Sequence, residues 1–193
     1  MPDAFVFPGG AVDASDRDLG PELAVAALRE LFEEAGILLA RDPHGLPVAL
    51  QINDLSDLRH EIAAGRTFAG MLERHGLVPD TSALVYYSNW ITPASEPIRF
   101  DAHFFLARAP SDQTATADAR EVHDGVWLTA RDALAAADRA ELNVRFPTRK
   151  HLERLARYPT IDDVFAHARD RAIQPVSPVE RADGSYVFDE DAW

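Results

Sequence analysis

Three glutamates, Glu30, Glu33 and Glu34, have the residue type and the spacing that most clearly allow chemistry. On a helix they stand at positions i, i+3 and i+4, so their carboxylates project from one face. Carboxylates packed this closely repel one another, and a hard divalent cation such as Mg²⁺, which takes oxygen ligands, removes that penalty. Arg29 can pair with Glu33 four residues later and fix the orientation of that carboxylate. The simpler interpretation is an acidic helix face exposed to solvent.

The element that must carry these glutamates is a helix over residues 21–35. Its apolar residues recur with the helical period and form one stripe. They are Ala24, Ala27, Leu28, Leu31 and Ala35. The glutamate face lies about a third of a turn from that stripe. Pro21 suits the first turn of a helix, and Gly36 suits its end.

The rest of the sequence predicts a mixture of strands and helices. Strands are predicted at residues 3–7, 82–92, 98–108 and 122–128, of which the second and third form a hairpin. Helices are predicted at residues 130–137, 147–157 and 160–171, and residues 41–80 form a separate helical piece. Residues 13–20 are expected to form a loop, and the tail from Gln174 is expected to lie across the surface.

The composition is that of an ordinary globular protein of 193 residues, 47% apolar and 26% charged. Acidic residues outnumber basic ones 32 to 19, and the formal net charge of −13 argues against nucleic acid as a partner. No apolar run approaches the roughly 18–20 residues needed to cross a bilayer, so no membrane association is expected. Cysteine is absent, which excludes a thiolate zinc site and a cysteine nucleophile. These features predict a cytoplasmic protein.

Residues 29–37, Arg-Glu-Leu-Phe-Glu-Glu-Ala-Gly-Ile, together with Gly9-Gly10 resemble the Nudix box, whose pattern is G-x5-E-x7-R-E-U-x-E-E-x-G-U with U a bulky aliphatic residue. The second half of the pattern matches at every specified position. Phe7-Pro8 also looks like the approach that is common before the box. The resemblance implies an α/β Nudix fold, a mixed sheet between helices. It implies a single domain over residues 1–193, with the box at 10–37 and a helical insertion at about 41–80.

One departure from the pattern concerns its isolated glutamate. The pattern has 13 residues between its glycine and its arginine, whereas 18 residues separate Gly10 from Arg29 here. Asp16, Asp18 and Glu22 are all candidates for the counterpart of that glutamate, and the sequence does not choose among them.

The resemblance also implies a metal site and a reaction. In similar enzymes the three helix glutamates and a glycine carbonyl bind Mg²⁺ or Mn²⁺, which corresponds to Glu30, Glu33, Glu34 and the carbonyl of Gly10. The implied reaction is hydrolysis of a nucleoside diphosphate linked to another moiety, a small-molecule substrate. Glu33 and Glu34, with Arg29 beside them, are the catalytic candidates within the box.

A glutamate outside the box often contributes the general base in this family, and Glu121 is the candidate here. The alternative is that Glu121 is an ordinary exposed acid in a loop. A rival interpretation of the whole chain is a non-catalytic Nudix-fold module that binds a nucleotide and regulates or scaffolds. The three intact glutamates argue against it, since a binding-only domain has no need for mutually repelling carboxylates.

Secondary motifs resemble one branch of the family, which includes the peroxisomal coenzyme A diphosphatases and their bacterial relatives. They are Trp90-Ile91-Thr92-Pro93, Arg99-Phe100-Asp101, Phe104-Phe105, Glu141-Leu142 and Phe146-Pro147-Thr148. This makes coenzyme A or an acyl-CoA the leading substrate, followed by ADP-ribose or a dinucleotide. Arg99 could contact a phosphate, and Trp90, Phe100 or Tyr87 could stack on an adenine. Ordinary packing is the favoured alternative for each aromatic residue.

The start of the chain departs from the family as well. A Nudix domain usually has a few strands ahead of its Gly-Gly turn, whereas nine residues precede Gly10. If those strands are missing, the sheet has an exposed edge that invites pairing with another chain. The sequence therefore predicts a homodimer or a compromised fold.

Overall fold

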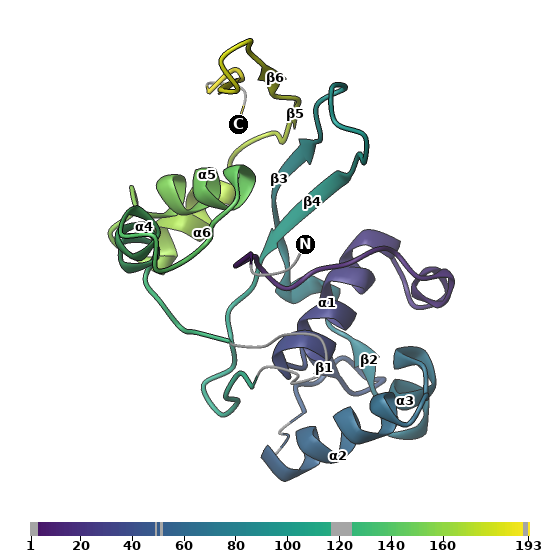
Figure 1. Ribbon diagram of the computed structural model, residues 1–193. Coiled ribbons are helices and arrows are strands. Elements are labelled where there is room, and N and C mark those ends of the chain that lie inside the picture. The colour runs from purple at the N-terminus through teal and green to yellow at the C-terminus, as the bar shows by residue number, and fades with distance from the viewer. Residues whose placement is uncertain (1–3, 49, 51, 117–124, 191–192) are drawn as a thin grey trace. The chain divides into compact units, whose positions relative to one another are not determined.

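The computed structural model describes residues 4–48, 50, 52–116, 125–190 and 193. They fall into two compact units that alternate along the chain (Figure 1). One unit comprises Phe7–Leu84 and Ala107–Trp127, and the other comprises Met1–Val6, Val85–Leu106 and Leu128–Trp193. No helix in the described part of the chain is long and apolar enough to cross a bilayer.

The first unit is mainly helical. Its elements are η1 (Ala14–Asp18), α1 (Glu22–Ala35), β1 (Ala40–Arg41), α2 (Ile52–Ala63), α3 (Phe68–Arg74), β2 (Val78–Pro79) and η2 (Thr81–Ala83). The helix predicted over residues 21–35 is confirmed as α1, with Pro21 as its N-cap. Gly36 ends it in the left-handed conformation, at a φ of 70°, and its N–H donates to the carbonyl of Phe32.

The expectation of a plain loop at residues 13–20 is wrong, because a short 3-10 helix, η1, forms there. Its cause is a reciprocal cap. The Asp13 carboxylate accepts from the N–H of Ser15 at 2.8 Å, and the Asp16 carboxylate accepts from the N–H of Asp13 at 2.8 Å. Aspartate side chains that satisfy free N–H groups in this way start a helical turn.

Two helices, α2 and α3, occupy the segment in which helices were predicted, residues 41–80. β1 and β2 close this segment as an antiparallel pair, with Ala40 opposite Pro79. The segment shares a core with α1, because Phe32 packs among apolar side chains from both helices. The buried members of this core are Phe32, Leu38, Leu55, Leu58, Phe68, Met71, Leu72 and Leu77.

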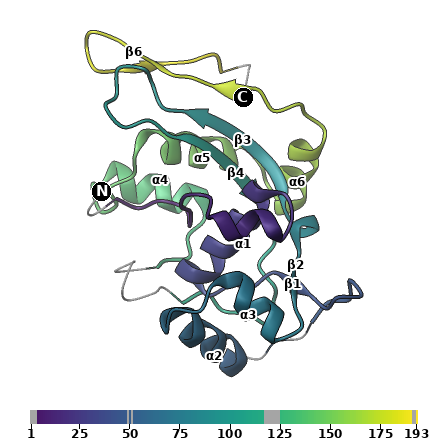
Figure 2. The same ribbon diagram turned by 90° about the vertical axis from the view of Figure 1, so that its right-hand side faces the viewer.

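The second unit contains a three-stranded sheet in the order β4-β3-β5 (Figure 2). Its elements are β3 (Val85–Ile91), β4 (Asp101–Leu106), α4 (Ala130–Asp138), α5 (Phe146–Leu155), α6 (Ile161–Arg169), β5 (Pro175–Val176), β6 (Val179–Glu180) and β7 (Tyr186–Val187). The predicted hairpin is confirmed, since β3 and β4 pair antiparallel. The three helices predicted after residue 129 are also confirmed.

The strands predicted at residues 3–7 and 122–128 do not form in the described residues. Phe5 makes a single bridge to Val144 and no extended strand. Of the strand predicted at 122–128, residues 122–124 lie outside the described residues, and residues 125–128 form no strand.

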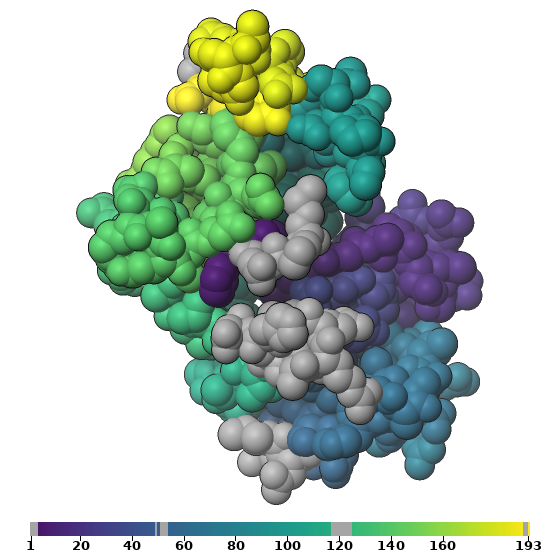
Figure 3. Space-filling view, in the orientation of Figure 1, coloured from purple at the N-terminus to yellow at the C-terminus, as the bar shows by residue number. Residues whose placement is uncertain are grey.

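The C-terminal tail is integrated into the second unit rather than merely lying across its surface. β5 adds a parallel strand beside β3, and Trp193 is buried against Trp90. The β6–β7 hairpin lies next to the turn between β3 and β4 (Figure 3), where Ser95 donates to Glu180 at 3.0 Å. Burial of a large aromatic side chain explains why the tail is held.

Candidate functional site

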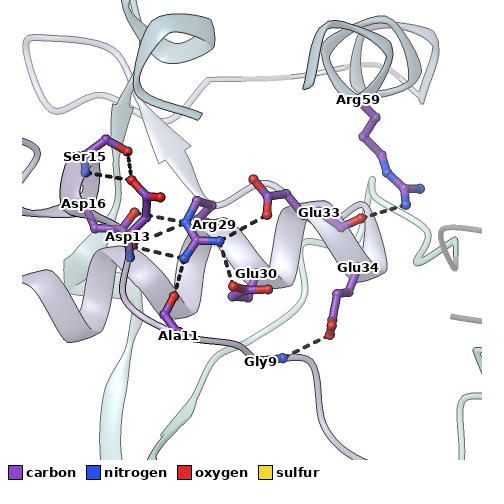
Figure 4. Close-up of polar contacts among 10 residues, drawn as sticks. All are labelled: Gly9, Ala11, Asp13, Ser15, Asp16, Arg29, Glu30, Glu33, Glu34 and Arg59. Atoms are coloured by element: carbon purple, nitrogen blue, oxygen red, sulfur yellow. Dashed lines mark hydrogen bonds and ion pairs between the residues drawn. The ribbon is translucent and has the colours of Figure 1, made fainter. Parts of the chain in front are cut away.

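The centre of the candidate site is the guanidinium of Arg29 on α1, which contacts three carboxylates (Figure 4). Its Nη1 donates to Glu30 Oε1 at 2.7 Å and to Glu33 Oε2 at 3.1 Å. Its Nε and Nη2 donate to the Asp16 carboxylate, and Nη2 also donates to the carbonyl of Ala11 at 2.8 Å. The predicted pairing of Arg29 with Glu33 is therefore confirmed.

Asp16 is the acid whose role the sequence left open. It is fully buried, and it alone of the three candidates contacts Arg29. Glu22 instead pairs with Arg17 near the surface. A signal was present in the spacing, because five residues separate Gly10 from Asp16, as in the first part of the box pattern. The additional residues therefore lie between Asp16 and Arg29.

The electrostatic balance of the site is strongly negative. Burial lowers the pKa of Arg29, but its hydrogen bonds with Asp16 and Glu30 outweigh that effect, so the net pKa is raised and the guanidinium stays charged. The carboxylates of Asp16, Glu30, Glu33 and Glu34 gather along this part of α1. An additional cation at this face would therefore be attracted.

The glycine turn before η1 lies directly against these carboxylates. Glu34 Oε2 accepts from the N–H of Gly9 at 3.0 Å. A Cβ added to Gly10 would lie 2.2 Å from Glu30 Oε1, so this close approach requires glycine. The segment at Gly9 and Gly10 thus brings main-chain atoms to the same helix face as the glutamates (Figure 4).

The donor set suits a hard divalent cation. Carboxylate and carbonyl oxygens are the ligands that Mg²⁺ and Mn²⁺ prefer, and Gly10, Glu30, Glu33 and Glu34 offer both kinds. Over the described ranges, no three His, Cys, Asp or Glu side chains are already arranged as a metal-holding group. Nη1 of Arg29 donates to both Glu30 and Glu33. A cation at this face would therefore bind to carboxylates that Arg29 already holds close together.

A second arginine, Arg59 on α2, was not identified from the sequence. Its Nη2 donates to the main-chain carbonyl of Glu33 at 3.0 Å, and its Nη1 donates to Thr116 at 2.8 Å. Arg59 therefore ties the end of α1 to α2 and to the segment at residue 116. No pattern in the sequence points to this role, because a helix arginine that binds main-chain oxygens looks like any solvent-exposed arginine.

The predicted substrate-binding residues Trp90, Arg99 and Phe100 lie in the second unit. Arg99 donates from Nε to the carbonyl of Thr92 at 3.2 Å, and the Phe100 side chain is largely exposed. Trp90 is 3% exposed and packs edge-on against Phe146 and other aromatic rings. Its ring has no open face for an adenine, so the packing interpretation of Trp90 holds. Glu121 lies outside the described residues.

Comparison with known proteins places this geometry in a family. The family model described as NUDT19 Nudix domain matches residues 18–155. A crystal structure of a NUDIX hydrolase from Alicyclobacillus acidocaldarius has a similar fold, with a TM-score of 0.74 and 30% identity. The likeness covers 86% of this chain and 81% of that one.

Curated relatives are similar over part of their length. The putative nudix hydrolase 7 of Caenorhabditis elegans is 30% identical over 137 residues, which cover 71% of this chain and 45% of the relative. The acyl-coenzyme A diphosphatase NUDT19 of Gallus gallus is 26% identical over 236 residues, covering 90% of this chain and 62% of the relative. The chain thus spans about half to two thirds of these relatives. With a family match over most of its length and a solved neighbour of the same fold, the chain belongs to the Nudix hydrolase family as a NUDT19-type Nudix domain.

Proposed function

We propose that the chain is a metal-dependent pyrophosphohydrolase that cleaves a nucleoside diphosphate linked to another moiety. The observation that carries this proposal is the Arg29 network, in which one guanidinium holds Asp16, Glu30 and Glu33. A domain that only bound a nucleotide would gain nothing from keeping these carboxylates together, since their mutual repulsion costs free energy.

The residues that would hold Mg²⁺ or Mn²⁺ are Glu30, Glu33 and Glu34, with the carbonyl of Gly10. When bound, such a cation supplies neutralising charge for the phosphate oxygens and makes a bound water more acidic. Arg29 orients Glu30 and Glu33 for this role, and the buried Asp16 holds Arg29 in turn. The N–H of Gly9 orients Glu34.

A carboxylate must accept the proton of the attacking water, and we assign this role to Glu33 or Glu34. Both are on α1, whose C-terminal end is fixed by the Gly36 cap and by the bond from Arg59 to the carbonyl of Glu33. A base held on a rigid helix keeps its geometry during the reaction. Glu121 remains the candidate from outside the box.

Coenzyme A or an acyl-CoA is the leading substrate in this proposal. It is supported by the name of the Gallus gallus relative and by the secondary motifs at residues 90–105. Within those motifs, the Phe100 ring is open to a ligand, and Arg99 offers a cation for a phosphate. Trp90 is not included, because its ring is buried.

The test is release of phosphate-containing products from coenzyme A, an acyl-CoA, ADP-ribose, diadenosine polyphosphates and NADH, with Mg²⁺ and with Mn²⁺. The inactive variant is Glu34→Gln, and the matched control is Glu22→Gln, which removes an exposed acid from the same helix. Turnover that Glu34→Gln abolishes and Glu22→Gln retains supports the proposal. Turnover that is equal in both variants, or that survives complete chelation of the metal, contradicts it.

A further inference from the structure

Three arginines in the second unit lie together without an acidic partner. Arg154 is in the last turn of α5, Arg157 follows that helix, and Arg171 follows α6. Throughout the described ranges, none of the three forms an ion pair with a carboxylate. Arg149 and Lys150, on the same α5, both pair with Glu153. In a chain with a net charge of −13, three unpaired cations in one place call for an explanation.

Three buried hydrogen-bond donors at this cluster also lack acceptors. They are Nη1 of Arg154, Nη2 of Arg171 and the hydroxyl of Tyr87, none of which finds a partner in the described part of the protein. Tyr87 itself is only 2% exposed. Buried donors are almost always satisfied in folded proteins, so three together indicate a missing acceptor. Since guanidinium groups donate and never accept, that acceptor carries oxygen lone pairs and fits a negative charge.

Tyr87 packs against Val164 and Ala168 of α6, and α6 lies against β3 (Figure 2). Burial raises the pKa of Tyr87 to about 12, while the charges of Arg154, Arg171 and Arg157 act in the opposite direction on the same hydroxyl. Burial lowers the pKa of Arg171, and the charge of Arg154 lowers it further. Arg154 and Arg171 are thus close enough to repel one another and to act on Tyr87, whose hydroxyl remains a protonated donor.

Other groups at the cluster do not supply the acceptor. The Arg154 guanidinium lies over the Trp193 ring, with Cζ 4.4 Å from the ring centroid, but a ring face carries no oxygen lone pair to accept from Nη1. His167 Nε2 is 3.4 Å from Arg171 Nη1, a long contact that leaves Nη2 without a partner. Asp170 acts on His167 but forms no ion pair with Arg171.

We propose that Arg154, Arg171 and the Tyr87 hydroxyl form a binding site for a phosphate-type oxyanion. Two guanidinium groups and a neutral hydroxyl donor match the several oxygens of a phosphate. The ligand is either free phosphate or a phosphomonoester carried by a nucleotide, because both present the same chemistry. The proposal is independent of the hydrolase reaction, since none of these residues belongs to the Arg29 network.

The test is isothermal titration with sodium phosphate, with ionic strength held constant by chloride. The variants are Arg171→Gln and Tyr87→Phe, and the matched control is Arg169→Gln, which removes an exposed cation from the end of the same helix. We expect binding to weaken about tenfold or more in Arg171→Gln and about threefold in Tyr87→Phe. Arg169→Gln should bind phosphate as the unaltered protein does.

Three outcomes would overturn the proposal: no phosphate binding, equal binding in all four proteins, or the same heat from added chloride. If Arg171→Gln does not fold, Tyr87→Phe still tests the proposed phosphate site, because it removes only one oxygen atom. A second titration compares 3′-phosphoadenosine with adenosine and with phosphate. Binding of 3′-phosphoadenosine more tightly than phosphate identifies a nucleotide phosphomonoester as the source, and equal binding identifies free phosphate.

Discussion

The guanidinium of Arg29 binds both carboxylate oxygens of the buried Asp16, with Nε 3.0 Å from Oδ1 and Nη2 3.1 Å from Oδ2. This pair joins η1 to α1 across 13 positions of sequence. Asp16 also caps η1 by accepting from the N–H of Asp13. The same carboxylate therefore shapes the loop before the helix and fixes the arginine that orients Glu30.

Replacing Asp16 with asparagine should destabilise the protein strongly. Breaking a buried ion pair costs about 3–5 kcal/mol, and we expect the lower end of that range because Arg29 keeps Glu30 and Glu33 as partners. The measurement is urea unfolding at neutral pH, with Asp18→Asn as the control because Asp18 is exposed on the same short helix. A loss of stability no larger in Asp16→Asn than in Asp18→Asn would contradict the prediction.

Adding one methyl group at Gly10 should impair the site more than the fold. The new Cβ would meet Glu30 Oε1 at 2.2 Å, so the carboxylate or the turn must move away. We expect Gly10→Ala to lower kcat/KM at least about tenfold, since ångström-scale misplacement of reacting groups is costly. Gly9→Ala is the matched control, because its nearest contact is 4.0 Å away. Equal activity in the two variants would show that the close approach is unimportant.

The sequence predicted the elements whose signals are local. The helix α1 has a clear apolar stripe and a glycine stop at Gly36, and the hairpin of β3 and β4 is rich in β-branched and aromatic residues. The pairing of Arg29 with Glu33 follows from helical spacing alone. These predictions hold because neighbours along the chain determine them.

Contacts between distant segments could not be predicted in the same way. The choice of Asp16 depended on knowing where the additional residues of the box lie, and only its contact with Arg29 on another element distinguishes it from Asp18 and Glu22. Arg59 binds main-chain oxygens, which leave no pattern in the sequence. The sequence does not distinguish an aromatic strand residue that stacks on a ligand from one that packs in the core. For Trp90, its burial against Trp193 shows that it is a core residue.

Stability should fall as the pH drops from about 6.5 to about 4 because of His151. This buried ring donates from Nδ1 to the carbonyl of Pro147 and accepts at Nε2 from the hydroxyl of Ser88. Burial lowers its pKa from 6.5 to about 4. Between these two pH values the ring is therefore protonated in the unfolded chain and neutral in the folded protein. By linkage, His151 should cost about 3 kcal/mol of stability across the range.

The measurement is the free energy of unfolding against pH, compared between the protein, His151→Gln and His44→Gln. His151→Gln should flatten the slope between pH 4 and 6.5, whatever its effect at neutral pH. His44→Gln removes an exposed histidine and should keep the slope. An unchanged slope in His151→Gln would refute the assignment.

Replacing Phe100 with alanine should weaken substrate binding without weakening the fold. The side chain is 62% exposed, so its removal opens no cavity, while loss of a stacking surface should raise KM for coenzyme A by about 3–10-fold with kcat little changed. Ile98→Ala is the matched control, since Ile98 is 67% exposed on the same loop but offers no ring. Steady-state kinetics with both variants distinguish ring stacking by Phe100 from general apolar contact with the loop. An equal rise in KM would point to general apolar contact, and no rise in either variant would remove Phe100 from the substrate site.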